Sequence, residues 1–317
     1  MNILITGADG FIGRALVARL LAGGGLDGLG DAHKRLTLLD QRFASTPDDA
    51  RVRLVSGDIS DQAVLADALS GGVDCVFHLA SIPGGAAESS FELGMRVNLV
   101  ATAGLLEQLR RQGKRARVVF ASTIGVYGVP LPRLIDEETP TAPTMSYGAH
   151  KLIGEVLVSD YSRRGFIDGR SLRLPGIVAR PPQASGMLSA FMSDLIRALS
   201  TRREFTCPVS PDGMAWWMSR SCVVENLLHA AALSPEQAQR RRVYLLPVLH
   251  ASMADVVSAI AKIHGPEVLS RVTYQPNAEL QAQFANLPPL RCPASIEAGF
   301  RHDGTLETLV QRALDAP

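Results

Sequence analysis

The sequence lacks the features that mark exported, membrane-spanning and nucleic-acid-binding proteins. None of its apolar runs reaches about 18 residues, and its start carries no basic leader. Lys and Arg number 32 and Asp and Glu 31, so the net charge of +1 offers nucleic acid or an anionic membrane no electrostatic footprint. The four cysteines lie far apart without the paired spacing of a metal site. They predict reduced thiols in a cytoplasmic protein, with no metal bound.

The composition suits a folded protein with a large apolar core. Of its 317 residues, 46% are hydrophobic and 20% charged, enough for one large core or two lobes. Short apolar runs alternate with helical spacing through the first half, which predicts an α/β fold with a Rossmann-type doubly wound parallel sheet. The expected strands are 2–6, 35–40, 51–56, 74–79, 117–121 and 169–174, and the expected helices are 12–21, 62–69, 89–112 and 146–164.

Beyond residue 175 the pattern changes to segments punctuated by proline and glycine. Short helices are expected there at 187–199, 223–233 and 253–263. We therefore expect two domains, a Rossmann domain over residues 1–175 and a smaller α/β substrate lobe over 176–317. A segment near 215–235 is expected to return to the first domain.

A glycine-rich loop separates the first expected strand from the first helix. Its glycines, Gly7, Gly10 and Gly13, lie where backbone amides can approach a pyrophosphate at a helix N-terminus. A tight turn is the alternative interpretation. Asp40 ends the second strand, where a carboxylate can bond the adenosine ribose hydroxyls and would repel a 2'-phosphate. NAD is therefore favoured over NADP, while Arg42 nearby and a simple turn carboxylate keep the alternatives open.

Tyr147 and Lys151 are four residues apart in an expected helix. This spacing places both side chains on one face, so that an ammonium can lie close to a phenol. A nearby positive charge favours the phenolate and lowers the tyrosine pKa from its usual value of about 10. Tyr147 could then exchange a proton with a substrate hydroxyl. With the glycine loop, the pair indicates a nicotinamide-dependent enzyme.

Thr123 completes the expected catalytic set. It follows an apolar run and so lies at the C-terminal end of a buried strand, where open sheets bind ligands. Its hydroxyl would orient the substrate oxygen, with a second hydrogen bond from Ser122; simple strand-end polarity is the alternative. Tyr127 competes with Tyr147 for the proton-transfer role, but no lysine follows it four residues later, so we interpret it as packing near the site. His78, alone in an apolar strand, is interpreted as structural.

These motifs resemble the extended branch of the short-chain dehydrogenase/reductase superfamily, the NAD-dependent epimerases and dehydratases. The Gly-x-x-Gly-x-x-Gly spacing, the Tyr147–Lys151 pair and Thr123, aligned on Val126-Tyr127-Gly128, carry the resemblance. It implies NAD as cofactor and Thr123, Tyr147 and Lys151 as catalytic residues. The cofactor contacts that it implies are Gly7, Gly10, Phe11, Ile12, Gly13, Asp40, Asp58, Ile59, Leu79, Ala80, Asn98, Tyr147, Lys151, Pro175 and Ile177.

Segments 91–98, 161–170 and 171–175 resemble a narrower group, the D-erythronate dehydrogenases. This resemblance spans most of the chain and implies oxidation of the C2 hydroxyl of a small sugar acid, a D-erythronate-like aldonate, to the 2-keto acid, with Tyr147 as general base. Departures at 79–81 and 121–123 leave the exact substrate open. The expected substrate contacts are Ser81, Ser122, Thr123, Tyr147 and Arg180, the last because a guanidinium suits a carboxylate. Arg220 is a weaker candidate, and for both arginines a salt bridge within the protein is the alternative.

Two other functions share these motifs. A nucleotide-sugar 4-epimerase or dehydratase would hold NAD tightly and use Thr123, Tyr147 and Lys151 on a larger substrate, for which the second lobe is short. A non-enzymatic NAD-sensing protein commonly lacks the Tyr and Lys that this chain has. By analogy we also expect a homodimer, with the helices at 89–112 and 146–164 of each subunit forming a four-helix bundle.

Overall fold

Parallel strands form the central sheet of the computed structural model, which describes residues 1–23, 35–180 and 189–314. The strand order is β10-β6-β5-β4-β1-β2-β3. In chain order the strands are β1 (Asn2–Thr6), β2 (Arg35–Asp40), β3 (Val52–Ser56), β4 (Cys75–His78), β5 (Arg117–Thr123), β6 (Asp168–Leu174) and β10 (Val243–Leu245). The order reverses between β1 and β4, and such a switch point is where open α/β sheets bind ligands. The doubly wound fold expected from the sequence is confirmed.

The central strands form because their apolar runs are buried on both faces of the sheet. In β1, Ile3, Leu4 and Ile5 are each at most 1% exposed, and the strand pairs with β2 on one side and β4 on the other. Such continuous apolar runs are typical of parallel sheets covered by helices. Each of the six strands expected from the sequence is present, with its ends shifted by at most two residues.

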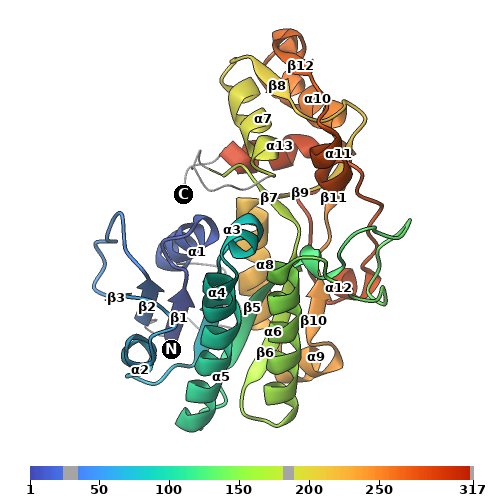
Figure 1. The fold of residues 1–317 in the computed structure, drawn as a ribbon. Helices are drawn as coiled ribbons and strands as arrows, with labels where there is room; N and C mark the ends of the chain where they lie inside the picture. The colour runs from blue at the N-terminus through green and yellow to red at the C-terminus, as the bar shows by residue number, and fades with distance from the viewer. Residues whose placement is uncertain (24–34, 181–188, 315–317) are drawn as a thin grey trace.

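Helices cover both faces of the sheet (Figure 1). α1 (Phe11–Ala22) and α8 (Arg220–Ala232) pack together on one face, and their apolar residues share a core with those of β1 and β2. α2 (Gln62–Leu69), α5 (Ala101–Gln112) and α6 (Ser146–Arg163) pack on the other face, where they form a second core. β10 is therefore a strand of the central sheet and α8 packs on that sheet, although both lie beyond residue 175.

The helix expected at 89–112 is broken, which corrects that prediction. The chain forms α3 (Gly84–Ser89), α4 (Phe91–Gly94), a π-helical segment η1 (Met95–Val100) and then α5. Ser90, between α3 and α4, leaves the helical region with φ −136° and ψ 80°. Gly94 lies so close to α3 that a Cβ there would be 3.0 Å from the Ala87 Cβ. Tertiary contacts therefore override the local helical pattern.

A smaller body of structure lies at one end of the sheet (Figure 1). It contains a sheet of order β11 (Leu249–Ser252), β9 (Met214–Ser219), β7 (Gly176–Val178) and the pair β12 (Val272–Tyr274), β8 (Phe205–Cys207). Four helices pack around them: α7 (Ala190–Ser200), α10 (Met253–His264), α11 (Ala278–Phe284) and α13 (Leu306–Leu314). Two short helices, α9 (Pro235–Arg240) and α12 (Pro293–Glu297), are drawn below this body in Figure 1, near β10. The expected helices 223–233 and 253–263 correspond to α8 and α10, and 187–199 to α7, with 187–188 outside the described residues. The division at residue 175 stays a prediction.

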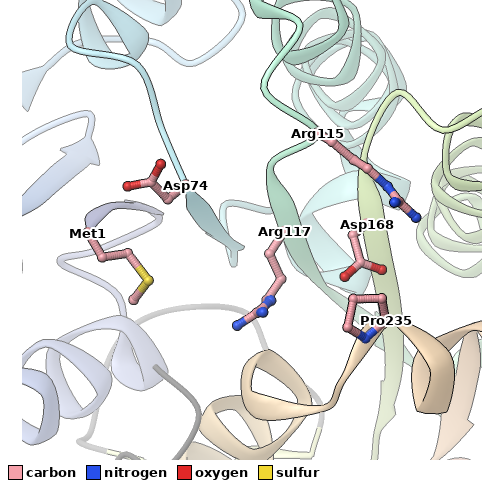
Figure 2. Close-up of a pocket in the computed structure, with 6 residues that line it drawn as sticks. All are labelled: Met1, Asp74, Arg115, Arg117, Asp168 and Pro235. Carbon is pink, nitrogen blue, oxygen red and sulfur yellow. The ribbon is translucent and has the colours of Figure 1, made fainter. Parts of the chain in front are cut away.

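A cavity of about 290 Å³ opens at the N-terminal edge of the central strands (Figure 2). It is lined by Met1, Asp74, Arg115, Arg117, Asp168 and Pro235. This edge is opposite to the one where open sheets bind ligands, and its charges serve the protein itself: Asp168 pairs with Arg170 and Arg242, and Arg117 donates to the Ala231 carbonyl. The described residues contain no cluster of His, Cys, Asp or Glu suited to a metal ion. None of the described helices is long and apolar enough to span a membrane.

Candidate functional site

The structure brings the expected catalytic residues together at the C-terminal ends of the strands. Thr123 is the last residue of β5, and Tyr147 lies in the first turn of α6. The helix can approach the strand end because Gly148 has no side chain: a Cβ there would lie 2.4 Å from the Gly125 carbonyl oxygen. The Thr123 hydroxyl accepts a bond from the Gly125 N–H at 3.0 Å, and the side chains of Thr123 and Ser81 both act on the Tyr147 phenol to lower its pKa. The start of α6 thus lies against the end of β5 that carries Thr123.

The electrostatics around Tyr147 differ from the sequence prediction. Burial raises the pKa of its phenol, and the effect is opposed by the charge of Arg180 and by hydrogen bonds with Ser81 and Thr123. The predicted lowering by Lys151 is wrong for this structure. Lys151 is itself 2% exposed, and burial lowers the pKa of its ammonium to about 7. Arg180 is the cation that favours the phenolate, and the burial of Tyr147 outweighs its effect.

Lys151 nevertheless lies beside Tyr147. Its Nζ is 5.8 Å from the centre of the Tyr147 ring and 4.9 Å from that of Phe120. Both aromatic faces attract the charged form, which partly offsets the cost of burial. One turn of helix separates the two residues, as their spacing predicted.

The glycine loop packs too tightly for side chains at two of its three glycines. Gly7 has φ +71°, and a Cβ there would lie 2.7 Å from the Ala80 nitrogen. A Cβ on Gly13 would lie 2.1 Å from the Gly7 carbonyl oxygen. Gly10 is the N-cap residue of α1 and has no side chain that could accept a hydrogen bond. The backbone N–H groups of Phe11 and Ile12 at the start of the helix therefore have no side-chain cap. The loop and helix together form a cradle suited to a pyrophosphate.

Asp40 lies against this loop, as expected for a ribose-binding carboxylate. Its Oδ2 accepts a hydrogen bond from the Asp9 N–H at 2.8 Å, and its Oδ1 accepts one from the Gln41 N–H at 2.7 Å. Burial raises the pKa of its carboxyl, opposed by these two bonds. Asp58 follows β3, where it accepts bonds from the Ser60 backbone and hydroxyl and lies 3.3 Å from Arg96. The structure thus places both carboxylates at the C-terminal ends of neighbouring strands, β2 and β3.

The loop after β4 carries the predicted contacts Leu79, Ala80 and Ser81. Ala80 donates its N–H to the Thr6 hydroxyl at 3.3 Å, which ties this loop to the end of β1. Asn98, in the π-helical segment, has its amide engaged with Ile82: Oδ1 accepts from the Ile82 N–H at 2.7 Å, and Nδ2 donates to the Ile82 carbonyl at 3.0 Å. Asn98 therefore holds the loop in place, and its role as a cofactor contact stays a prediction.

The Ser122 side chain is turned toward α6. Its side chain is 2% exposed, and its hydroxyl donates to Glu155 Oε1 at 2.5 Å. The alternation of side chains along β5 directs it to the other face of the strand from Thr123, and the substrate contact of Ser122 stays a prediction that this arrangement does not support. Ile59 and Ile177, both predicted cofactor contacts, are 6% exposed and pack in the cores of the sheet. Pro175 joins β6 to β7.

Arg180 and Arg220 meet at Phe11. Each guanidinium carbon lies 5.1 Å from the centre of the Phe11 ring, within the range of a cation–π contact. Arg180 is partly buried and makes no ion pair with a carboxylate of the described residues. The Phe11 ring was not expected from the sequence to hold these arginines, because nothing in the local pattern signals a contact between α1 and residue 180. The Arg180 guanidinium is also close enough to Tyr147 for its charge to lower the pKa of the phenol.

His78 and Tyr127 have structural partners, as interpreted from the sequence. His78 is 1% exposed; its Nδ1 lies 2.7 Å from the Thr6 hydroxyl and its Nε2 2.9 Å from that of Thr102. Burial and then the charge of Lys151 lower the His78 pKa to about 3, so the ring is neutral. The Tyr127 hydroxyl accepts a bond from Arg173 at 2.9 Å, and burial raises its pKa.

Comparisons with known proteins agree with this geometry. A model described as the NAD dependent epimerase/dehydratase family matches residues 3–219. The chain belongs to this family. It is 41% identical to a D-erythronate dehydrogenase of Cupriavidus necator over 99% of this chain and 98% of that protein. A D-erythronate dehydrogenase of Haemophilus influenzae is 29% identical over 99% of both chains. The similarity to these dehydrogenases identifies the family member as an oxidoreductase.

A solved structure shows the same fold with substantial sequence similarity. The crystal structure of a nucleoside-diphosphate-sugar epimerase from Agrobacterium tumefaciens matches with a TM-score of 0.89 and 34% identity, covering 98% of this chain and 92% of that chain. The family therefore includes relatives of this chain whose names give them different reactions. Choosing between these reactions depends on the site itself.

Proposed function

We propose that the chain oxidises the C2 hydroxyl of a small sugar acid, D-erythronate or a close aldonate, to the 2-keto acid with NAD. The observation that carries the proposal is the close packing of α6, which carries Tyr147, on the end of β5 at Thr123; there Arg180, Ser81 and Thr123 each lower the pKa of the phenol. A phenol and hydroxyls suit an alcohol, and a guanidinium suits a carboxylate. The full-length similarity to two D-erythronate dehydrogenases supports the same substrate class.

The residues present fit NAD. The cradle formed by Gly7 and Gly13 leaves no room for a Cβ, and the uncapped start of α1 offers its N–H groups to a pyrophosphate. Asp40 beside the loop suits the adenosine ribose and disfavours a 2'-phosphate. We assign Lys151 to the nicotinamide ribose, since it lies beside Tyr147 on α6. When bound, NAD supplies the hydride acceptor.

Tyr147 is the proposed general base. Its phenolate takes the proton of the C2 hydroxyl, while Ser81 and Thr123 hold the hydroxyl oxygen in place. Because burial raises the pKa of Tyr147, the phenolate is scarce at neutral pH. Arg180 opposes this effect, and its side chain would also bind the carboxylate next to C2. We therefore expect oxidation to accelerate as the pH rises above neutrality.

The test is NADH absorbance with the purified protein, NAD and a panel of C4 to C6 aldonates and uronates. Tyr147→Phe should abolish turnover and leave NAD affinity unchanged. Tyr161→Phe, which removes a phenol hydroxyl from the far end of the same helix, is the matched control and should retain activity. The proposal fails if no sugar acid in the panel is oxidised, or if Tyr147→Phe retains full activity.

A nucleotide-sugar epimerase or dehydratase is the second candidate, because the Agrobacterium tumefaciens structure is 34% identical over nearly the whole chain. Such an enzyme would convert UDP-sugars without net release of NADH. A separate arm with UDP-sugars, followed by chromatography of the products, distinguishes it. Conversion of UDP-sugars together with silence on every aldonate would move the protein to that reaction.

We also propose that the protein forms a homodimer in the cytoplasm. Large apolar side chains are exposed on the helices expected to pair: Phe91 at the start of α4, Val100 at the end of η1, and Ile153 and Val156 on α6. These helices lie side by side on one face of the molecule (Figure 1). Burying such side chains in a second copy would be favourable. The cytoplasmic location is supported by four cysteines that are all unpaired and buried.

A further inference from the structure

A buried polar network lies one helical turn beyond Lys151. Glu155 is 2% exposed and accepts a bond from the Ser122 hydroxyl at 2.5 Å. Arg173 grips the same carboxylate with two bonds, Nε to Oε1 at 3.0 Å and Nη2 to Oε2 at 2.8 Å. Arg173 also donates through Nη1 to the Tyr127 hydroxyl at 2.9 Å, and its guanidinium lies 5.1 Å from the centre of that ring.

The network joins the elements that carry the proposed catalytic side chains. Ser122 immediately precedes Thr123 on β5, and its Cα partner on β6 is Arg173. Glu155 lies on the same face of α6 as Tyr147 and Lys151, since the three follow one another at intervals of four residues. A displacement at Glu155 would therefore move α6 relative to the end of β5, where Thr123 meets Tyr147.

Stability alone is a weak reason for such an arrangement. Taking a carboxylate and a guanidinium out of water costs much of what their attraction returns, and apolar residues of similar volume often stabilise as well. A bidentate pair does provide a fixed distance and orientation between its partners. A second buried pair, Asp168 with Arg170, lies at the opposite end of β6 and contacts none of these groups.

We propose that Glu155 and Arg173 are positioning residues that hold Thr123 against Tyr147 by tying β5, α6 and β6 together at the site. The inference rests on the proposed function in that Tyr147 is the base. It extends that function by two residues that touch neither substrate nor cofactor. Misplacement of reacting groups by about 1 Å can cost on the order of 100-fold in rate, so a small loosening of this pair should be visible in kcat.

The test is the double variant Glu155→Gln with Arg173→Met. Glutamine keeps an oxygen for the Ser122 hydroxyl, and neither charge is left unpaired. We expect kcat to fall about 10- to 100-fold, with NAD affinity and binding stoichiometry unchanged. Asp168→Asn, which disturbs the other buried pair of β6, should lower stability and leave kcat of the folded protein as in the wild type. Wild-type kcat in the folded double variant would overturn the proposal.

A second readout needs no substrate. The chain has five tyrosines, so ring-labelled ¹³C-tyrosine gives few NMR signals, and Tyr147→Phe assigns the one of interest. Loosening its contact with Thr123 should raise the pH at which the Tyr147 signal titrates, while the Tyr161 and Tyr274 signals stay unchanged. An unchanged Tyr147 titration in the folded variant refutes the inference.

These two readouts separate the inference from the proposed function. If the wild type oxidises no aldonate, the proposed substrate is wrong, and the tyrosine titration still decides the role of the pair. Should the double variant fail to fold, Arg173→Lys replaces it, because lysine keeps the charge and loses the bidentate grip. The same shift of the Tyr147 titration is expected there, and its absence counts against the proposal.

Discussion

Replacing Arg180 with methionine tests its two proposed roles, which are to bind the substrate carboxylate and to lower the pKa of Tyr147. Hydrogen bonds to a charged group contribute about 1.5–3 kcal/mol, and each 1.4 kcal/mol corresponds to about tenfold. Loss of the guanidinium should therefore lower kcat/KM for an aldonate by roughly 10- to 150-fold. The charge of Arg180 also lowers the pKa of Tyr147, so its removal should shift the rise of activity with pH to higher pH. Methionine retains apolar contact with the Phe11 ring.

The assay is steady-state NADH formation from pH 6 to about 11, near the usual tyrosine pKa, with D-erythronate and with erythritol, which lacks the carboxylate. Arg180→Lys is the matched control: it keeps the charge, so the pH dependence should persist, and it loses the planar fork, so KM for the acid should rise. Direct titration with NAD monitors cofactor binding. An equal loss of kcat/KM on both substrates refutes the carboxylate role, and a loss confined to NAD affinity would assign Arg180 to the cofactor.

Three further predictions concern the cofactor, acid stability and assembly. Asp40→Ala should raise the ratio of kcat/KM with NADP to that with NAD about tenfold or more, because it removes the carboxylate that repels a 2'-phosphate; an unchanged ratio contradicts the assignment. The pKa of His78 is about 3 in the fold against an ordinary 6.5, so the unfolded chain binds the extra proton between these values. His78 should contribute a fall in the free energy of unfolding of up to about 1.4 kcal/mol per pH unit as the pH drops below 6.5, and urea titrations at several pH values should show a shallower slope for His78→Gln than for the wild type. Val156→Lys should halve the mass measured by light scattering and leave NAD affinity unchanged; a wild-type protein that is already monomeric refutes the dimer.

The strands and the glycine loop could be predicted because their signals are local. β1 and β2 have the bounds expected from the sequence, since a short apolar run ended by glycine or a polar residue has few alternatives in a parallel sheet. The break in the helix at 89–112 could not be predicted in this way. It depends on contacts of Gly94 with Ala87 and of Asn98 with Ile82, which join residues apart in sequence. The spacing of apolar residues along a helix does not indicate which distant residues will contact it.

The candidate site shows the same division. The spacing of Tyr147 and Lys151 correctly predicted their proximity, because helix geometry alone determines it. The sign of the pKa change did not follow, since it depends on how deeply the surrounding fold buries each group. Ser122 was similarly assigned to the substrate from its place beside Thr123. In the structure its hydroxyl bonds Glu155, which lies four residues beyond Lys151 on the same helix.

Three arginines within eleven residues of sequence illustrate why a ligand contact has to be decided in three dimensions. Arg170 is buried and Arg173 is partly buried, and each is paired with a carboxylate, Asp168 or Glu155. Arg180 is partly buried, stacks on Phe11, and is paired with no carboxylate of the described residues. Removing a guanidinium from water without an anion is unfavourable, so a substrate carboxylate would supply at Arg180 what Glu155 supplies at Arg173. The first two arginines serve the fold, and the third is the one that we propose binds the substrate carboxylate.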